Sequence, residues 1–217
     1  MDRFMEIFTL LTGVIYIVLE IRQKNFMWVV GVVTSIAAIY TFMCQHLYAS
    51  VALNAYYFCI SFWGLYQWRR DAGKLAVMSG NGDMQGRLEA TAVEVAAEEN
   101  ESHGGDRIHL NRLGWKTVLG CAVFFVAGLV LLRLLLVWLG DPMSGLDAAV
   151  AVLSAVATYM LSRSYIEQWL LWIVADIMST ALCFSQGLYW MTGLYSMYTI
   201  AAVYGYIHWK RNGVYVS

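Results

Sequence analysis

Seven long apolar runs occupy most of this chain of 217 residues. A helix that crosses a bilayer needs about 20 consecutive, mostly apolar residues, and runs of this order recur along the sequence. We therefore predict an all-α integral membrane protein with seven transmembrane helices. The runs cover residues 4–21, 26–43, 49–68, 115–138, 148–161, 169–184 and 190–209.

Composition supports this class and excludes others. The chain is 60% apolar and only 13% charged, whereas an average soluble domain has about 25% charged residues. The net charge of -1 provides no row of cations to neutralise phosphates, so nucleic acid is not expected as a partner. The cysteines and histidines do not show the spacing of metal ligands. We predict no catalytic residue, no cofactor and no metal, and hence no enzyme.

One polar segment divides the apolar runs into two sets. Glycines and acidic residues concentrate there, and we expect an exposed loop outside any binding site. The predicted domains are 1–70, a first three-helix unit; 71–112, a cytoplasmic acidic loop; 113–140, a linker transmembrane helix; and 141–217, a second three-helix unit with a short C-terminal tail.

The distribution of positive charge predicts the orientation. If seven spans alternate across the membrane, all but two of the 14 Lys and Arg residues fall on the same side, the exceptions being Arg3 and Arg133. Cytoplasmic loops hold the excess of Lys and Arg. The N-terminus is therefore expected outside, with the acidic loop and the C-terminus in the cytoplasm.

The chain resembles itself when it is shifted by 141 residues. Twelve of the 49 pairs formed between residues 22–70 and 163–211 are identical. A single helix separates the two three-helix repeats, so they run in parallel (3+1+3). Some transporters are built in this way and bind substrate near the midplane between the repeats. The identical pairs include Trp28 with Trp169, Tyr57 with Tyr198, Gly64 with Gly205, and Trp68 with Trp209.

Three motifs resemble the PnuC family of bacterial vitamin transporters. They are Asn25-Phe26-x-Trp28-x-x-Gly31, Gly64-Leu65-Tyr66-Gln67-Trp68 and Trp169-x-x-Trp172-x-x-x-Asp176. The resemblance covers residues 1–70 and 113–211 and omits the acidic loop. It implies import of nicotinamide riboside by facilitated diffusion through the bacterial inner membrane, and a fold akin to the SWEET sugar transporters. Many relatives have Gln at the position of Asn54.

Polar and aromatic residues inside the apolar runs are the candidates for substrate binding. Trp169, Trp172 and Asp176 share one helix face, and a carboxylate inside a span usually faces a bundle interior or a water-filled cavity. Aromatic faces would attract the pyridinium ring of the implied substrate. The predicted substrate-binding residues are Trp28, Thr34, Asn54, Tyr57, Trp169, Trp172, Asp176, Tyr195 and Tyr198.

Other residues at the helix ends have structural interpretations. Trp209 lies beside Lys210 and Arg211 and is expected to anchor at the membrane interface, a role that is also open to Trp169. Glu20 and Lys24 have the i, i+4 spacing of a surface ion pair.

The sequence leaves alternatives to the leading hypothesis. The expected partners are a small-molecule substrate and membrane lipid, and assembly into a homo-oligomer stays open. The rival functions are a SWEET-like transporter of another small solute, such as a sugar or another vitamin, and a seven-helix membrane sensor.

Overall fold

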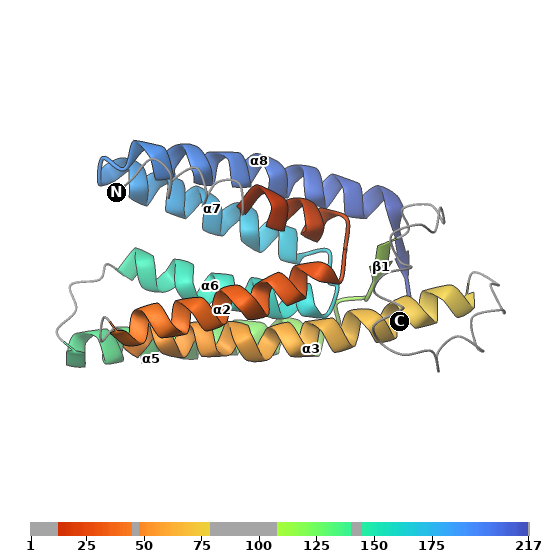
Figure 1. The fold of residues 1–217 in the computed structure, drawn as a ribbon, viewed down its shortest axis with the longest axis horizontal. Helices are drawn as coiled ribbons and strands as arrows, with labels where there is room; N and C mark the ends of the chain where they lie inside the picture. The colour runs from red at the N-terminus through yellow and green to blue at the C-terminus, as the bar shows by residue number, and fades with distance from the viewer. Residues whose placement is uncertain (1–12, 45–47, 79–107, 140–144, 217) are drawn as a thin grey trace.

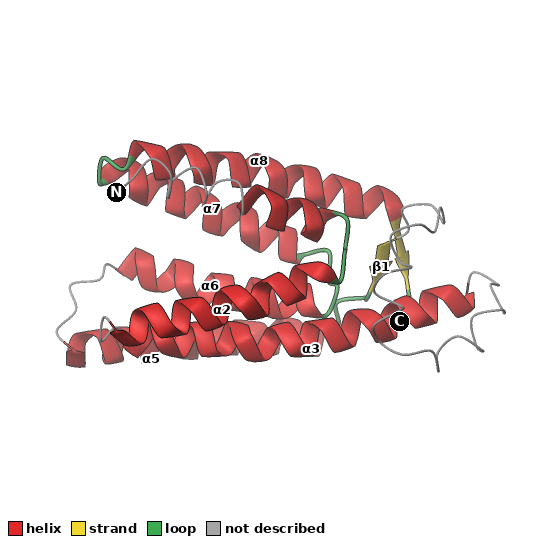
Figure 2. Ribbon diagram, viewed as in Figure 1, coloured by secondary structure: helices red, strands yellow, loops and turns green. Residues whose placement is uncertain are grey.

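The described part of the chain is almost entirely helical (Figures 1 and 2). The computed structural model describes residues 13–44, 48–78, 108–139 and 145–216. The N-terminal helix covers residues 13–21. The other elements are α2 (Phe26–Cys44), α3 (Tyr48–Met78), β1 (Ile108–Leu110), α5 (Trp115–Leu139), α6 (Gly145–Ser162), α7 (Gln168–Ser185), α8 (Tyr189–Asn212) and β2 (Gly213–Tyr215).

The helices lie along the long axis of the molecule in two groups (Figure 1). One group contains the N-terminal helix with α7 and α8, and the other contains α2, α3, α5 and α6. Within the groups, α2 packs on α3 and α7 packs on α8. Helix α6 contacts both α3 and α7. It therefore connects the two groups and holds them side by side.

A short parallel sheet closes one end of the molecule, which we call the strand end. In this sheet β1 pairs with β2, with Ile108 opposite Gly213 and Leu110 opposite Tyr215. The chain keeps its all-α class, but the sequence did not predict these two short strands. A strand of three residues has no recognisable periodicity, and its partner lies more than a hundred residues away in the sequence.

Helix α3 continues beyond the apolar run that predicted it. The run ends at Trp68, whereas the helix continues to Met78. In this extension Lys74 donates a hydrogen bond of 2.9 Å to Asp71, one turn earlier. Such a polar pair supports a helix without apolar side chains, so hydropathy could not indicate where the helix ends. The interior of the predicted acidic loop, residues 79–107, lies outside the described residues.

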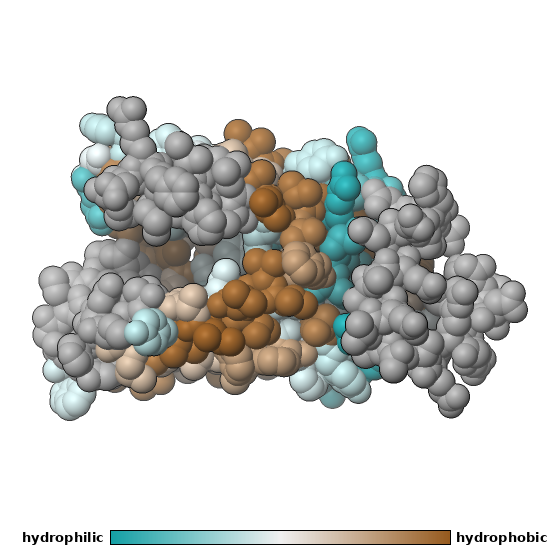
Figure 3. Space-filling model, viewed as in Figure 1, coloured by the Kyte–Doolittle hydropathy of each residue, from teal (hydrophilic) through white to brown (hydrophobic). Residues whose placement is uncertain are grey.

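Much of the apolar side-chain surface is exposed. Val33 and Tyr40 on α2 are 62% and 74% exposed, and Leu131 on α5 is 69% exposed. Figure 3 shows apolar atoms gathered over α2, and a hydrophilic band beside the strand end. Exposed apolar faces of this extent are typical of helices that contact lipid.

Hydropathy separates the described helices into stronger and weaker candidates for membrane spans. Trp115–Leu134 and Gln168–Ser185 are long and apolar enough to cross a membrane by length and composition. Phe26–Tyr40 and Ala148–Ser162 are shorter apolar helices. The count of seven spans therefore stays a prediction.

Candidate functional site

A cavity of about 510 Å³ lies between the two groups of helices. The N-terminal helix, α2, α3, α6, α7 and α8 all contribute to its wall. Pockets that bind small molecules usually have volumes of about 300–1,000 Å³. The cavity is therefore large enough for a nucleoside-sized ligand.

All nine predicted substrate-binding residues line this cavity. Aromatic side chains dominate the set, and in α8 the rings of Tyr195 and Tyr198 are 6.2 Å apart and nearly perpendicular. Asp176 is only 7% exposed although it reaches the cavity. The residues brought together are Trp28, Thr34, Asn54, Tyr57, Trp169, Trp172, Asp176, Tyr195 and Tyr198. The structure therefore places all nine residues around the same cavity. Their contact with substrate stays a prediction.

Most lining residues occur in pairs that are 141 positions apart in the sequence. In some pairs the two residues are identical, as with Trp28 and Trp169. In other pairs both positions line the cavity, but the two side chains differ. The further pairs are Gly13 with Ser154, Ile17 with Thr158, Gly31 with Trp172, Thr34 with Ala175, Ser35 with Asp176, Ala38 with Ser179, Asn54 with Tyr195, Tyr57 with Tyr198, and Ser61 with Ala202.

The unequal pairs make the two sides of the cavity chemically different. Gly31 of the first repeat corresponds to Trp172 of the second repeat, and Ser35 corresponds to Asp176. Asn54 is likewise paired with Tyr195. A ligand without twofold symmetry can be oriented by such a wall, because only one side offers each contact.

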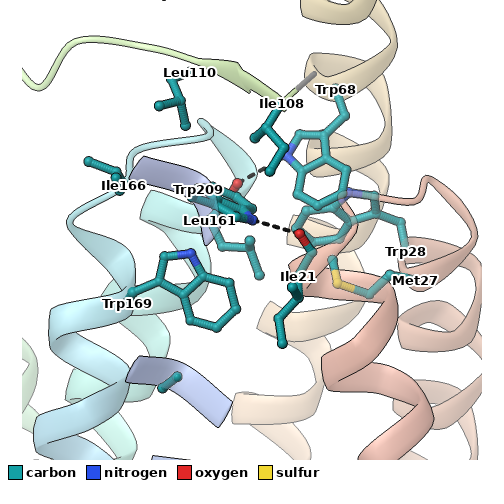
Figure 4. Close-up of a cluster of buried hydrophobic side chains, with 11 residues drawn as sticks. Ile21, Met27, Trp28, Trp68, Ile108, Leu110, Leu161, Ile166, Trp169 and Trp209 are labelled. Carbon is teal, nitrogen blue, oxygen red and sulfur yellow. Dashed lines mark hydrogen bonds between the residues drawn. The ribbon is translucent and has the colours of Figure 1, made fainter. Parts of the chain in front are cut away.

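Four buried tryptophans, Trp28, Trp68, Trp169 and Trp209, pack in one cluster that we call the tryptophan layer (Figure 4). Trp28 and Trp169 also line the cavity. The rings of Trp28 and Trp68 meet edge to face at 5.1 Å, and those of Trp169 and Trp209 at 5.5 Å. Ile108 of β1 belongs to the same buried cluster. Such edge-to-face pairs stabilise the tryptophan layer beyond the apolar burial of the rings.

Each repeat of the sequence contributes one indole that bonds to the other repeat, within the same group of helices. Nε1 of Trp68 donates to the carbonyl of Leu161 at 3.0 Å, and Nε1 of Trp209 donates to the carbonyl of Ile21 at 2.9 Å. Trp209 is fully buried. The interpretation of Trp209 as a membrane-interface anchor is therefore wrong, and the same holds for Trp169, whose side chain is also fully buried.

Two glycines permit the close approach of these rings. A Cβ atom on Gly64 would lie 2.5 Å from the ring of Trp28, and one on Gly205 would lie 2.6 Å from the ring of Trp169. The identical Gly and Trp positions of the two halves therefore have one packing explanation. They let the indole lie directly against a helix backbone.

Sequence reasoning missed several polar residues of the cavity, most importantly Glu20. This residue lines the cavity and is 4% exposed. Among the described residues it makes no ion pair with Lys24, so the predicted surface pair is wrong. The signal was present: Gly13, Tyr16 and Glu20 fall at i, i+3 and i+7, which is one helix face. The other polar lining residues outside the predicted set are Tyr16, Ser35, Ser61, Ser154, Thr158 and Ser179.

The cavity is lined by acidic residues. Glu20 and Asp176 are its acidic side chains, and Lys, Arg and His do not occur among the lining residues that the structure describes. A cleft with low-dielectric walls concentrates the field of such charges. The wall therefore favours a cation and disfavours an anion.

A network at the strand end joins the two halves beyond the tryptophan layer. Gln23 donates to the carbonyl of His109 at 3.0 Å and accepts from its backbone N–H at 3.0 Å. Asn111 donates to Asp71 at 2.7 Å and to the carbonyl of Arg163 at 2.8 Å. The segment that carries β1 is thereby fixed to the turn after the N-terminal helix, to α3 and to the turn after α6.

Two titratable groups in this network have shifted pKa values. Burial lowers the pKa of His109 to about 4, while Asp71 acts to raise it and Lys74 to lower it. Burial acts to raise the pKa of Asp71, but hydrogen bonds from Asn111 and Lys74 hold it below its usual value. The network is therefore most stable with His109 neutral and Asp71 ionised.

Comparison with known sequences assigns the chain to a transporter family. The sequence profile described as the nicotinamide mononucleotide transporter matches residues 3–211. The nicotinamide riboside transporter PnuC of Haemophilus influenzae is 30% identical over 118 residues, which are 53% of this chain and 50% of that protein. PnuC of Escherichia coli is 36% identical over 63 residues, which are 29% of this chain and 26% of that protein. The chain thus spans about half or less of these curated relatives.

One solved structure has a similar fold. The crystal structure of the vitamin B3 transporter PnuC superposes with a TM-score of 0.64, covering 97% of this chain and 82% of that one at 22% sequence identity. At this identity the likeness shows the fold. The profile match over nearly the whole chain and the shared all-α architecture confirm the resemblance drawn from the motifs. This membrane protein belongs to the nicotinamide mononucleotide transporter family, in which the PnuC proteins are found.

Proposed function

We propose that this protein imports nicotinamide riboside across the bacterial inner membrane by facilitated diffusion. The observation that carries the proposal is the cavity in which side chains from both halves of the chain meet. The name of the curated relatives, nicotinamide riboside transporter, supports the same substrate.

The residue types of the cavity suit this ligand. Nicotinamide riboside combines a flat pyridinium cation with an amide and a ribose. Aromatic faces such as that of Trp172 attract a cation by roughly 0.5–2 kcal/mol each. Asp176 can offset the charge or accept from ribose hydroxyls. Asn54, Tyr195 and Tyr198 offer donors and acceptors for the amide.

The proposed transport cycle uses the internal repeat. Seven spans, arranged as two parallel three-helix repeats with a linker helix, would rock about the cavity and expose it to either side in turn. The lining positions that are 141 residues apart support this arrangement.

The excess of Lys and Arg supports an outside N-terminus and a cytoplasmic C-terminus. A reporter fused after Ser217 should be active in the cytoplasm, and activity confined to the periplasm would reverse this orientation.

The decisive experiment measures uptake by the purified protein in lipid vesicles. Radiolabelled nicotinamide riboside should enter, and unlabelled nicotinamide riboside should compete. Nicotinamide mononucleotide, thiamine and glucose should compete weakly. Uptake of glucose or thiamine in preference to the riboside would instead favour a related transporter. Binding of the riboside without any uptake would favour a sensor.

A further inference from the structure

Glu20 is a buried carboxylate with an unsatisfied oxygen. Its Oε1 atom has no hydrogen-bond partner among the described residues, and the side chain is 4% exposed and lines the cavity. Removing a carboxylate from water is costly unless a partner compensates it. Ionisable residues inside membrane helices usually face a cavity and mark the path of a substrate or ion. Because Glu20 lines the cavity, a ligand bound there can supply the partner that Oε1 lacks.

The fold itself does not require an acid at this position. The residue 141 positions further along the chain is Leu161, which is 1% exposed and belongs to the buried apolar cluster. The second half thus fills the corresponding place with a leucine. Packing alone therefore does not explain the carboxylate.

The surroundings of Glu20 select the kind of partner. Gln168 is near enough to donate a hydrogen bond to the Glu20 carboxyl, and Asp176 is near enough to interact with it electrostatically. Glu20 and Asp176 line the cavity, whereas Gln168 does not. The indole Nε1 atoms of Trp28 and Trp169 are also buried without hydrogen-bond partners among the described residues. Two carboxyl groups that a cation would hold in the ionised form, together with aromatic faces, suit a flat organic cation that also has hydrogen-bond acceptors.

We propose that Glu20 is a specificity-determining residue that, together with Asp176, makes the cavity select a positively charged aromatic ring over a neutral ring of the same shape. The inference rests on the proposed function, because the cation in question is the pyridinium of nicotinamide riboside. Asp176 belongs to the predicted substrate site, whereas Glu20 adds a second charge on the N-terminal helix.

A pair of ligands that differ in charge tests this inference. Nicotinamide riboside is cationic, and its 1,4-dihydro form has nearly the same shape without the positive charge. Affinities of the full-length protein for both can be measured by tryptophan fluorescence or calorimetry. In Glu20→Gln, affinity for the cation should fall by about tenfold or more, as expected for loss of a desolvated charge interaction. Affinity for the neutral form should stay the same or rise, which also shows that the variant is folded.

Two further variants serve as controls. Glu20→Asp keeps the charge and should keep the preference for the cation. Glu167→Gln removes a carboxylate just before α7 whose Oε2 also lacks a hydrogen-bond partner among the described residues but which does not line the cavity, and it should leave both affinities unchanged. An unchanged ratio of the two affinities in Glu20→Gln would overturn the inference. If the parent protein bound neither ligand, the proposed function would fail instead, so the two failures are distinguishable.

Discussion

The side-chain amide of Gln23 donates a hydrogen bond of 3.3 Å to the hydroxyl of Ser164, which is 141 residues away in the sequence. The two residues occupy corresponding turns, one between the N-terminal helix and α2 and the other between α6 and α7. Both have left-handed backbones, with φ values of 51° and 54°. Such a conformation is uncommon for residues other than glycine. Equivalent residues that touch each other mark a local twofold relation between the halves.

This relation provides matched controls for the cavity. Asp176→Asn should weaken binding of nicotinamide riboside by about ten- to a hundredfold, because it removes a charged partner from a desolvated site. Ser35→Ala changes the corresponding position of the other half and should have a smaller effect. Binding can be followed by tryptophan fluorescence. Equal losses in the two variants would contradict a special role for the carboxylate.

The packing of the tryptophan layer predicts the effect of adding one methyl group. In Gly205→Ala the new Cβ would lie 2.6 Å from the ring of Trp169, and overpacking of this kind costs about 1–3 kcal/mol. A Cβ atom on Gly193, in the same helix, would meet none of the described residues within 4 Å, so Gly193→Ala should leave the unfolding temperature unchanged or raise it. Thermal unfolding in detergent measures both variants. A stable Gly205→Ala would show that the indole can move aside.

The buried imidazole at the strand end predicts a pH dependence of stability. The pKa of His109 is about 4, against an ordinary value of 6.5. Between these values the unfolded chain takes up a proton that the folded protein does not, so stability should fall as pH drops from 6.5 to 4. The contribution is at most about 3 kcal/mol. His109→Phe keeps a ring against Trp68, which meets the imidazole at 5.9 Å.

The matching measurement is the difference in unfolding temperature between the parent and His109→Phe across that pH range. As pH falls, the unfolding temperature of His109→Phe should rise relative to that of the parent protein. A difference that is constant with pH would mean that other groups cause the acid sensitivity.

We expect residues 79–107 to be dispensable for substrate binding, and the adjoining strand β1 to be necessary for stability. Replacement of residues 79–107 by a short Gly/Ser linker should preserve binding of nicotinamide riboside, because both groups of helices are complete without them. Replacement of Ile108 and Leu110 by Gly should lower the unfolding temperature, since both side chains are only 2% exposed in the buried cluster. Loss of binding in a folded 79–107 variant would bring the loop into the site.

Local sequence patterns were sufficient for the helical class and for the nine residues on the cavity wall. Apolar runs indicate buried or lipid-facing helices because hydropathy depends on each segment alone. Asp176 could be assigned to an interior because an acid is costly in lipid wherever the other helices lie. The 141-residue periodicity then suggested which helices would contribute corresponding residues, and the cavity contains them in pairs.

Only the tertiary structure decided the role of residues near the helix ends. At these positions a tryptophan can face lipid, water or another helix, and the hydropathy of its neighbours is the same in each case. Trp209 is buried because its indole reaches the carbonyl of Ile21, 188 residues away in the sequence. Glu20 faces the cavity because of the rotation of its helix, and β1 is a strand because β2 lies beside it. Each outcome depends on the distance between remote segments, which packing determines.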